Sequence, residues 1–149
     1  MKYDKPLIAG LFGCLCTIPA EIVSRILLAS GIGKYSVYQL DSLFITINRP
    51  NPIMGFIVSS TIGGLIAILF YFSLDKIGHD YIVLKSLFVN IFAWVVLETL
   101  SMAIIETRAI EPRPIVDYYA QLASTIVYGV VLGFLFKRFL IKKPSSQYR

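Results

Sequence analysis

Four apolar stretches, each close to or above the length that crosses a bilayer, limit what this chain can fold into. They cover residues 7–33, 53–74, 81–105 and 118–136. A helix needs about 20 apolar residues to cross the hydrocarbon core of a membrane. Because lipid offers no hydrogen bonds to the backbone, such stretches cross the membrane as helices. The sequence therefore predicts an all-α integral membrane protein, with four transmembrane helices in a single bundle over residues 1–149.

The composition agrees with a lipid environment. Of the 149 residues, 56% are hydrophobic and 15% are charged. A soluble domain carries about 25% charged residues, so the surplus apolar side chains here need the lipid bilayer as a partner. The net charge of +5 comes with a basic tail at residues 137–149. Basic residues just past a membrane span anchor the helix end on the cytoplasmic side, so we expect no nucleic-acid partner.

The distribution of lysine and arginine predicts the orientation. With four spans, both termini and the turn at residues 75–80 share one side of the membrane. That side holds more lysine and arginine than the other, where Lys34, Arg49, Arg108 and Arg113 lie. Since cytoplasmic segments carry the excess of basic residues, we expect both termini in the cytoplasm. The expected location is a bacterial cytoplasmic membrane, with the two long loops outside the cytoplasm.

The connection between the first two spans, residues 34–52, is not a simple polar loop. Val37, Leu40, Phe44 and Ile47 recur near helical spacing, which is typical of an amphipathic helix. The segment is too short and too polar to cross the membrane. We therefore expect an amphipathic interfacial segment, or a cap folded over the bundle, between the first and second transmembrane helices.

Small residues mark two faces for close helix packing. The second span carries Gly55, Ser59 and Gly63 at intervals of four, and the fourth span carries Gly129 and Gly133. Small side chains allow the backbones of two membrane helices to approach closely. We predict that these five residues lie at helix–helix contacts.

Charged side chains inside the spans are the main indication of function. Glu21 and Glu98 each lie roughly 21 Å from the inner end of their helix. Charges at such depth are costly, so they need a partner or a purpose. The second and fourth spans run in the opposite direction and bring polar residues to the same level. The predicted buried polar cluster comprises Glu21, Ser24, Arg25, Ser60, Glu98, Gln121 and Ser124.

Two interpretations of this cluster remain open. In the structural one, Arg25 pairs with Glu21, and Glu98 accepts hydrogen bonds from Arg25 or from hydroxyl groups, so that the cluster only holds the bundle together. In the functional one, the cluster forms an outward-facing pocket for a small polar or anionic ligand. Arg25 would then hold an anion, and one of the two glutamates would carry a proton or bind a cation.

The outer loops add a rim of charges. This rim comprises Arg49, Arg108, Glu111, Arg113 and Asp117. The simpler interpretation is a solvated surface, and the alternative is a site that holds a lipid phosphate group.

The sequence contains no metalloprotease, serine-hydrolase or P-loop motif. We expect no catalytic residue, metal or cofactor. The function that the sequence favours is a small-ligand or ion transporter, or a channel unit, assembled as a homo-oligomer. The alternatives are a non-transporting structural or partner subunit of a membrane complex and, with less support, an enzyme that modifies lipid head groups.

Overall fold

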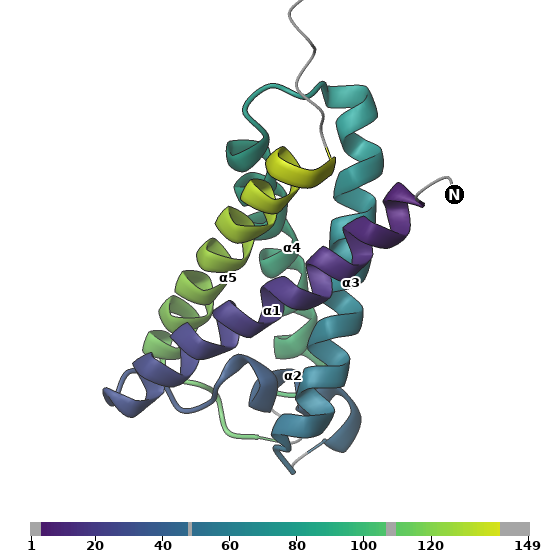
Figure 1. Ribbon diagram of the computed structural model, residues 1–149. Coiled ribbons are helices and arrows are strands. Elements are labelled where there is room, and N and C mark those ends of the chain that lie inside the picture. The colour runs from purple at the N-terminus through teal and green to yellow at the C-terminus, as the bar shows by residue number, and fades with distance from the viewer. Residues whose placement is uncertain (1–3, 48, 107–109, 141–149) are drawn as a thin grey trace, which may run out of the picture.

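The computed structural model describes residues 4–47, 49–106 and 110–140, and most of these are helical. Four helices are long and apolar enough to cross a membrane. They are α1 (Lys5–Ala29), α3 (Pro52–Ile77), α4 (Ile82–Ile104) and α5 (Ile115–Leu135). The short helix α2 (Val37–Thr46) lies across one end of this bundle, which we call the α2 end (Figure 1). The chain is thus an all-α membrane protein with four spans, as predicted.

Local sequence determines where α2 and α3 begin. Ser36 accepts a hydrogen bond from the backbone of Gln39, and the Gln39 side chain accepts one from the backbone of Ser36. This reciprocal arrangement is a capping box. Asn51 caps α3 by accepting from the backbone amides of Ile53 and Met54. The amphipathic segment of residues 34–52 is therefore a capped helix packed against the bundle, followed by a turn.

Several boundaries differ from the prediction by a few residues, and the largest differences lie at the ends of the first and last spans. The first span ends at Ala29, because the turn that follows needs the positive φ angles of Gly31 and Gly33, 78° and 101°. The last span continues as one π-helical turn, η1 (Phe136–Leu140). Residues 137–140 therefore extend the helix instead of starting the tail, and residues 141–149 lie outside the described part of the chain.

Neighbouring helices of the bundle are not packed equally closely. α1 packs against both α3 and α5, and α5 packs against α4. α3 and α4 barely touch. The order around the bundle is thus α3, α1, α5, α4, and the side between α3 and α4 is the least closed.

The small residues lie where backbones approach closely. A Cβ atom on Gly133 would come within 2.6 Å of the Val83 Cα atom in α4. A Cβ atom on Gly55 would overlap the backbone of Tyr38 in α2. Gly63 lies near Thr17 and the backbone of α1, and Gly129 lies near the backbone of α4. Close packing therefore joins α4 to α5, α2 to α3, and α1 to α3.

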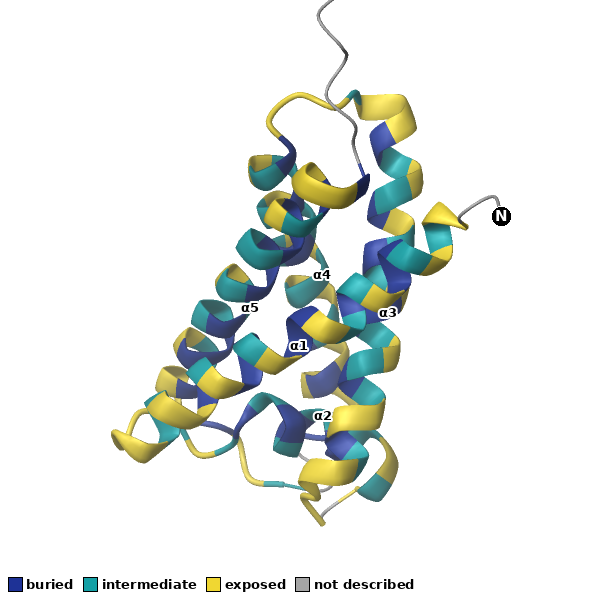
Figure 2. Cartoon of the chain, viewed as in Figure 1, coloured by how far each residue is buried: buried dark blue, intermediate teal, exposed yellow. Residues whose placement is uncertain are grey.

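The two halves of the bundle differ in chemistry. Far from α2 the interior is apolar, and the rings of Phe70 and Phe136 stack with centroids 5.3 Å apart. Figure 2 shows buried residues along the inner faces and exposed residues on the outward faces. Those outward faces carry large apolar side chains, such as Leu69 and Phe88, which are 67% and 74% exposed. Such surfaces fit a lipid bilayer.

Candidate functional site

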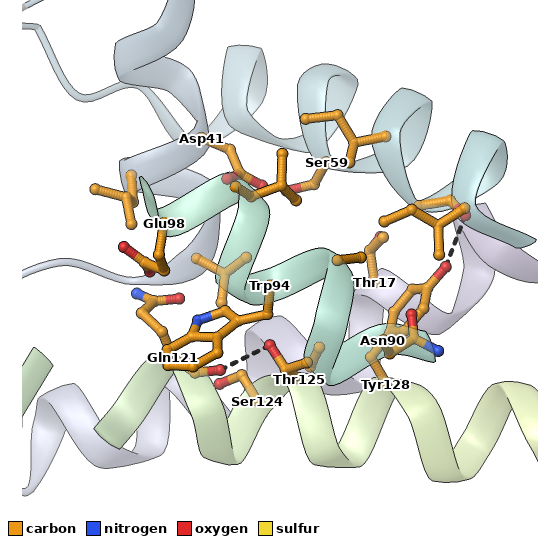
Figure 3. Close-up of a pocket in the computed structure, with 18 of the residues that line it drawn as sticks. Thr17, Asp41, Ser59, Asn90, Trp94, Glu98, Gln121, Ser124, Thr125 and Tyr128 are labelled. Atoms are coloured by element: carbon orange, nitrogen blue, oxygen red, sulfur yellow. Dashed lines mark hydrogen bonds between the residues drawn. The ribbon is translucent and has the colours of Figure 1, made fainter. Parts of the chain in front are cut away.

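A cavity of about 120 Å³ lies inside the α2 end of the bundle and is lined by all five helices (Figure 3). One water molecule occupies about 30 Å³ in the liquid, so the cavity has room for a few waters or for one small organic molecule. Most of its lining surface is apolar, but each of the five helices contributes polar side chains. The polar residues are Thr17, Asp41, Ser59, Asn90, Glu98, Ser101, Gln121, Ser124, Thr125 and Tyr128.

Two carboxylates line the cavity from different helices. Ser59 of α3 donates its hydroxyl to Asp41 Oδ2 of α2. Glu98 of α4 accepts from Arg113 Nη2 through Oε2, at 2.5 Å. Within residues 4–47, 49–106 and 110–140, the second oxygen of each carboxylate accepts no hydrogen bond. Burial, reinforced by the negative charges of Glu98 and Glu21, raises the pKa of Asp41 to about 7.

Arg113 is the arginine that balances Glu98, which corrects two expectations. From the sequence, Arg113 was expected on an outer-loop rim of charges, and Glu98 was expected to accept hydrogen bonds from Arg25 or from hydroxyl groups. The Arg113 side chain has no exposed surface, and it also donates from Nε to Glu106 at 2.5 Å. Its guanidinium lies 4.6 Å from the centre of the Tyr118 ring. The loop folds inward because two buried carboxylates attract this charge.

Two buried polar groups at the cavity lack a partner among the residues that the structure describes. They are Trp94 Nε1 and Ser101 Oγ, and both residues line the cavity. Leaving a buried polar group without a hydrogen bond costs about 1–3 kcal/mol. These two groups are therefore available to bond a water molecule or a ligand in the cavity.

Glu21, Ser24 and Arg25 lie outside the cavity lining, contrary to the predicted cluster. Glu21 is buried and accepts from the Ser36 hydroxyl and from the backbone amide of Tyr38, both at 2.9 Å. Ser24 accepts from the backbone amide of Val37. These groups satisfy the free amides at the start of α2, as capping residues do.

Arg25 is not a buried residue. Its side chain is 56% exposed and donates to Glu21 at 2.7 Å. It does not line the cavity, so it cannot hold an anion there. The physical reason is its position on α1, where it faces outward beside the start of α2.

The remaining rim residues divide into two groups. Arg49 and Glu111 are exposed, and Glu111 lies 3.9 Å from the Lys34 ammonium. Asp117 is buried instead and accepts a hydrogen bond from the backbone amide of Lys34. This bond draws Asp117 into the contact between α5 and the turn after α1. Arg108 lies outside the described residues.

Three residues of the predicted cluster do meet at the cavity, namely Glu98, Gln121 and Ser124. Ser60 lies elsewhere, with its hydroxyl buried and unpaired within the described chain. Ser59, predicted for helix packing, also lines the cavity.

Sequence reasoning missed Asp41. A signal was present, because Asp41 lies four residues after Val37 and three before Phe44, on the same helical stripe. That stripe faces the bundle, and Val37, Asp41 and Phe44 all line the cavity.

The end of the cavity far from α2 is closed by Tyr128. Its hydroxyl donates to the Gly63 carbonyl of α3 at 2.7 Å and so joins α5 to α3. Beyond it lies the apolar core that contains Ala67, Phe70 and Leu132. The cavity is therefore a polar pocket in one half of the molecule only.

The four spans and this pocket define the class of protein, a polytopic α-helical membrane protein with a polar cavity at one end. No family model, curated protein or solved structure matches the chain. Among the residues in the described ranges, no group of three or more His, Cys, Asp or Glu side chains could hold a metal ion.

Proposed function

We propose that the protein binds a small polar ligand in this cavity and acts as a transporter or channel unit for it. The observation that carries the proposal is a cavity inside a membrane bundle, lined in part by polar side chains, where Trp94 Nε1 and Ser101 Oγ have no hydrogen-bond partner among the described residues. Polar groups inside a membrane are costly and commonly mark a substrate or ion path. A ligand that bonds these groups would recover part of that cost.

The side between α3 and α4 is the natural entrance, because these two helices both line the cavity and barely touch. The distribution of basic residues favours a cytoplasmic location for both termini. The α2 end would then face away from the cytoplasm, in a bacterial cytoplasmic membrane. Four helices leave little room for a path, so transport would use a homo-oligomer.

A structural role is the second candidate. Glu21 and Ser24 are fully engaged in holding α2, and α4 exposes Phe88 and Phe92 at 74% and 65%. That exposed face would suit a partner subunit as well as lipid. A lipid-modifying enzyme has less support, because Arg113 is engaged by two carboxylates and is buried.

A ligand screen with a blocked cavity tests the proposal. Ala93→Phe would fill the cavity from α4, because Ala93 is part of its lining. Ala103→Phe makes the same change on an exposed position of the same helix. Thermal unfolding of both variants and of the wild type would be measured in detergent, with a panel of small amines, alcohols, amino acids, carboxylates and inorganic ions.

We expect some solutes to stabilise the wild type and Ala103→Phe but not Ala93→Phe. A ligand at about 100 times its dissociation constant adds about 2.7 kcal/mol, which thermal unfolding detects easily. Flux of each stabilising solute into proteoliposomes would then separate a transporter from a binding protein. A panel that stabilises neither the wild type nor Ala103→Phe would overturn the ligand-binding function and favour the structural role.

A further inference from the structure

We propose that the cavity selects a small organic cation, whose ammonium group bonds Asp41 and Glu98 while its carbon chain lies against Trp94. This inference rests on the proposed function and names its class of ligand. The three side chains come from α2 and α4, and Figure 3 shows them around the same space.

The balance of charge at the cavity favours a cation. Among the residues that the structure describes, the lining holds the acidic side chains of Asp41 and Glu98 but no lysine or arginine. The nearby Arg113 contributes one positive charge, and this charge is shared between Glu98 and Glu106. Among the described residues, negative groups therefore outnumber positive ones around the cavity, which favours a cationic ligand over an anionic one.

The unused hydrogen-bonding positions match an ammonium group. Asp41 and Glu98 each keep one oxygen that no described residue bonds. An ammonium group has three donors and no acceptor, so its chemistry matches two carboxylate oxygens that line one cavity. Hydrogen bonds between charged groups are about twice as strong as neutral ones.

The rest of the lining favours an organic cation over a bare metal ion. Leu40, Phe44 and Ile62 form an apolar wall suited to carbon chains. The indole ring of Trp94 attracts cations most strongly of the aromatic side chains. Its unpaired N–H, together with the unpaired Ser101 hydroxyl, needs a hydrogen-bonding partner. A ligand with both an ammonium and a hydroxyl group offers donors for the carboxylates and an acceptor for the Trp94 N–H.

The cavity is large enough for such a ligand. About 120 Å³ is open to the centre of a water molecule, and one water needs only about 10–15 Å³ of such space. A small amino alcohol such as ethanolamine therefore fits. The same ammonium chemistry occurs free in solution and on the head group of phosphatidylethanolamine, which could enter from lipid between α3 and α4.

Ligand binding can be followed by the fluorescence of Trp94, because it is the chain's one tryptophan and it lines the cavity. Its fluorescence would be followed in phosphatidylglycerol nanodiscs during titration with ethanolamine, ethylene glycol or glycolate, with sodium chloride as the baseline. These solutes have similar sizes but carry a positive, zero or negative charge. A second set of nanodiscs would contain phosphatidylethanolamine and no added solute.

Two matched variants complete the design. Asp41→Asn removes one of the two acidic groups of the lining, and Asp75→Asn makes the same change at an exposed position near the opposite end of α3. We expect ethanolamine to change the Trp94 signal in the wild type and in Asp75→Asn, and its affinity to fall at least tenfold in Asp41→Asn. A signal from phosphatidylethanolamine nanodiscs alone, lost in Asp41→Asn, would identify the cation as a lipid head group.

Equal binding of ethylene glycol or glycolate, with no effect of Asp41→Asn, would overturn the cation inference and leave the proposed function standing. No change of the Trp94 signal in either set of nanodiscs would also overturn it. The panel with Ala93→Phe tests the proposed function separately, so the two failures are distinguishable.

Discussion

Arg113 donates to Glu98 across the loop that separates α4 from α5, with Nη2 and Oε2 2.5 Å apart. The same guanidinium bonds Glu106 and lies over the Tyr118 ring. Its side chain has no exposed surface. One residue between two prolines thus ties the loop to the end of α4 and to the start of α5.

We expect Arg113→Gln to lower the free energy of unfolding by about 3–5 kcal/mol, since removing one partner leaves buried charges unpaired. Thermal unfolding in detergent would measure the loss. Arg49→Gln, at an exposed position, is the matched control and should change little. The double variant Arg113→Gln with Glu98→Gln should recover part of the loss, and equal stability of the Arg113 and Arg49 variants would contradict the role of the pair.

Ser24→Ala should loosen α2 without unfolding the bundle. The Ser24 hydroxyl accepts from the Val37 amide at 3.0 Å, and loss of such a cap costs about 1 kcal/mol. Hydrogen exchange of the α2 amides would therefore speed up by about fivefold, measured by mass spectrometry. Ser30→Ala is the control, because the Ser30 hydroxyl bonds its own helix. If Ser24→Ala left the hydrogen-exchange rates of the α2 amides unchanged, the bond from Val37 to Ser24 would not stabilise α2.

Gly133→Ala should destabilise the protein by about 1–3 kcal/mol, in the range of overpacked cores. The added Cβ would lie 2.6 Å from the Val83 Cα atom, so a backbone would have to move. Gly10→Ala is the matched control, because its nearest neighbour is the flexible end of Ile68, at 3.0 Å. The melting temperature of Gly10→Ala should be well above that of Gly133→Ala. The reverse order would contradict close packing of α4 on α5.

The titration of Asp41 should lower the free energy of unfolding as the pH rises. Burial, then the charges of Glu98 on α4 and Glu21 on α1, raise its pKa from 3.8 to about 7, although the Ser59 hydroxyl lowers it. From α5, the uncharged Gln121 lines the same cavity. Between these two pKa values the folded chain binds more protons than the unfolded chain, so stability decreases from about pH 4 to pH 7.

The difference in melting temperature between Asp41→Asn and the wild type isolates this effect. It should grow in favour of Asp41→Asn as the pH rises towards 7 and then level off. The exposed Asp75→Asn variant should show no such trend. A constant difference across this pH range would mean that Asp41 titrates near its ordinary value.

The membrane bundle was predictable because length and hydropathy alone require helices in lipid. The four spans differ from the prediction only near their ends, as at Gly31, where a positive φ angle turns the chain. The capping box at Ser36 also depends only on residues that are close in sequence. Such features depend on neighbours in sequence, which the sequence displays directly.

The site was only partly predictable, because it depends on which residues meet after folding. Arg108 and Arg113 look alike in a loop rich in charge, and nothing local reveals that Arg113 folds inward to Glu98. Arg25 is four residues after Glu21, a spacing that marks an ion pair but does not tell whether the pair faces inward. The depth of each residue along its helix was enough to predict that Glu98, Gln121 and Ser124 lie close together.

The hydrogen bond from Tyr128 to Gly63 divides the described interior of the bundle into two parts. Past this bond lie mainly apolar side chains, including the stacked rings of Phe70 and Phe136, together with the Ser86 hydroxyl, which bonds the Gly129 carbonyl. If the protein carries a solute, as we propose, a solute that crosses through this interior would have to displace the Tyr128 hydroxyl from Gly63.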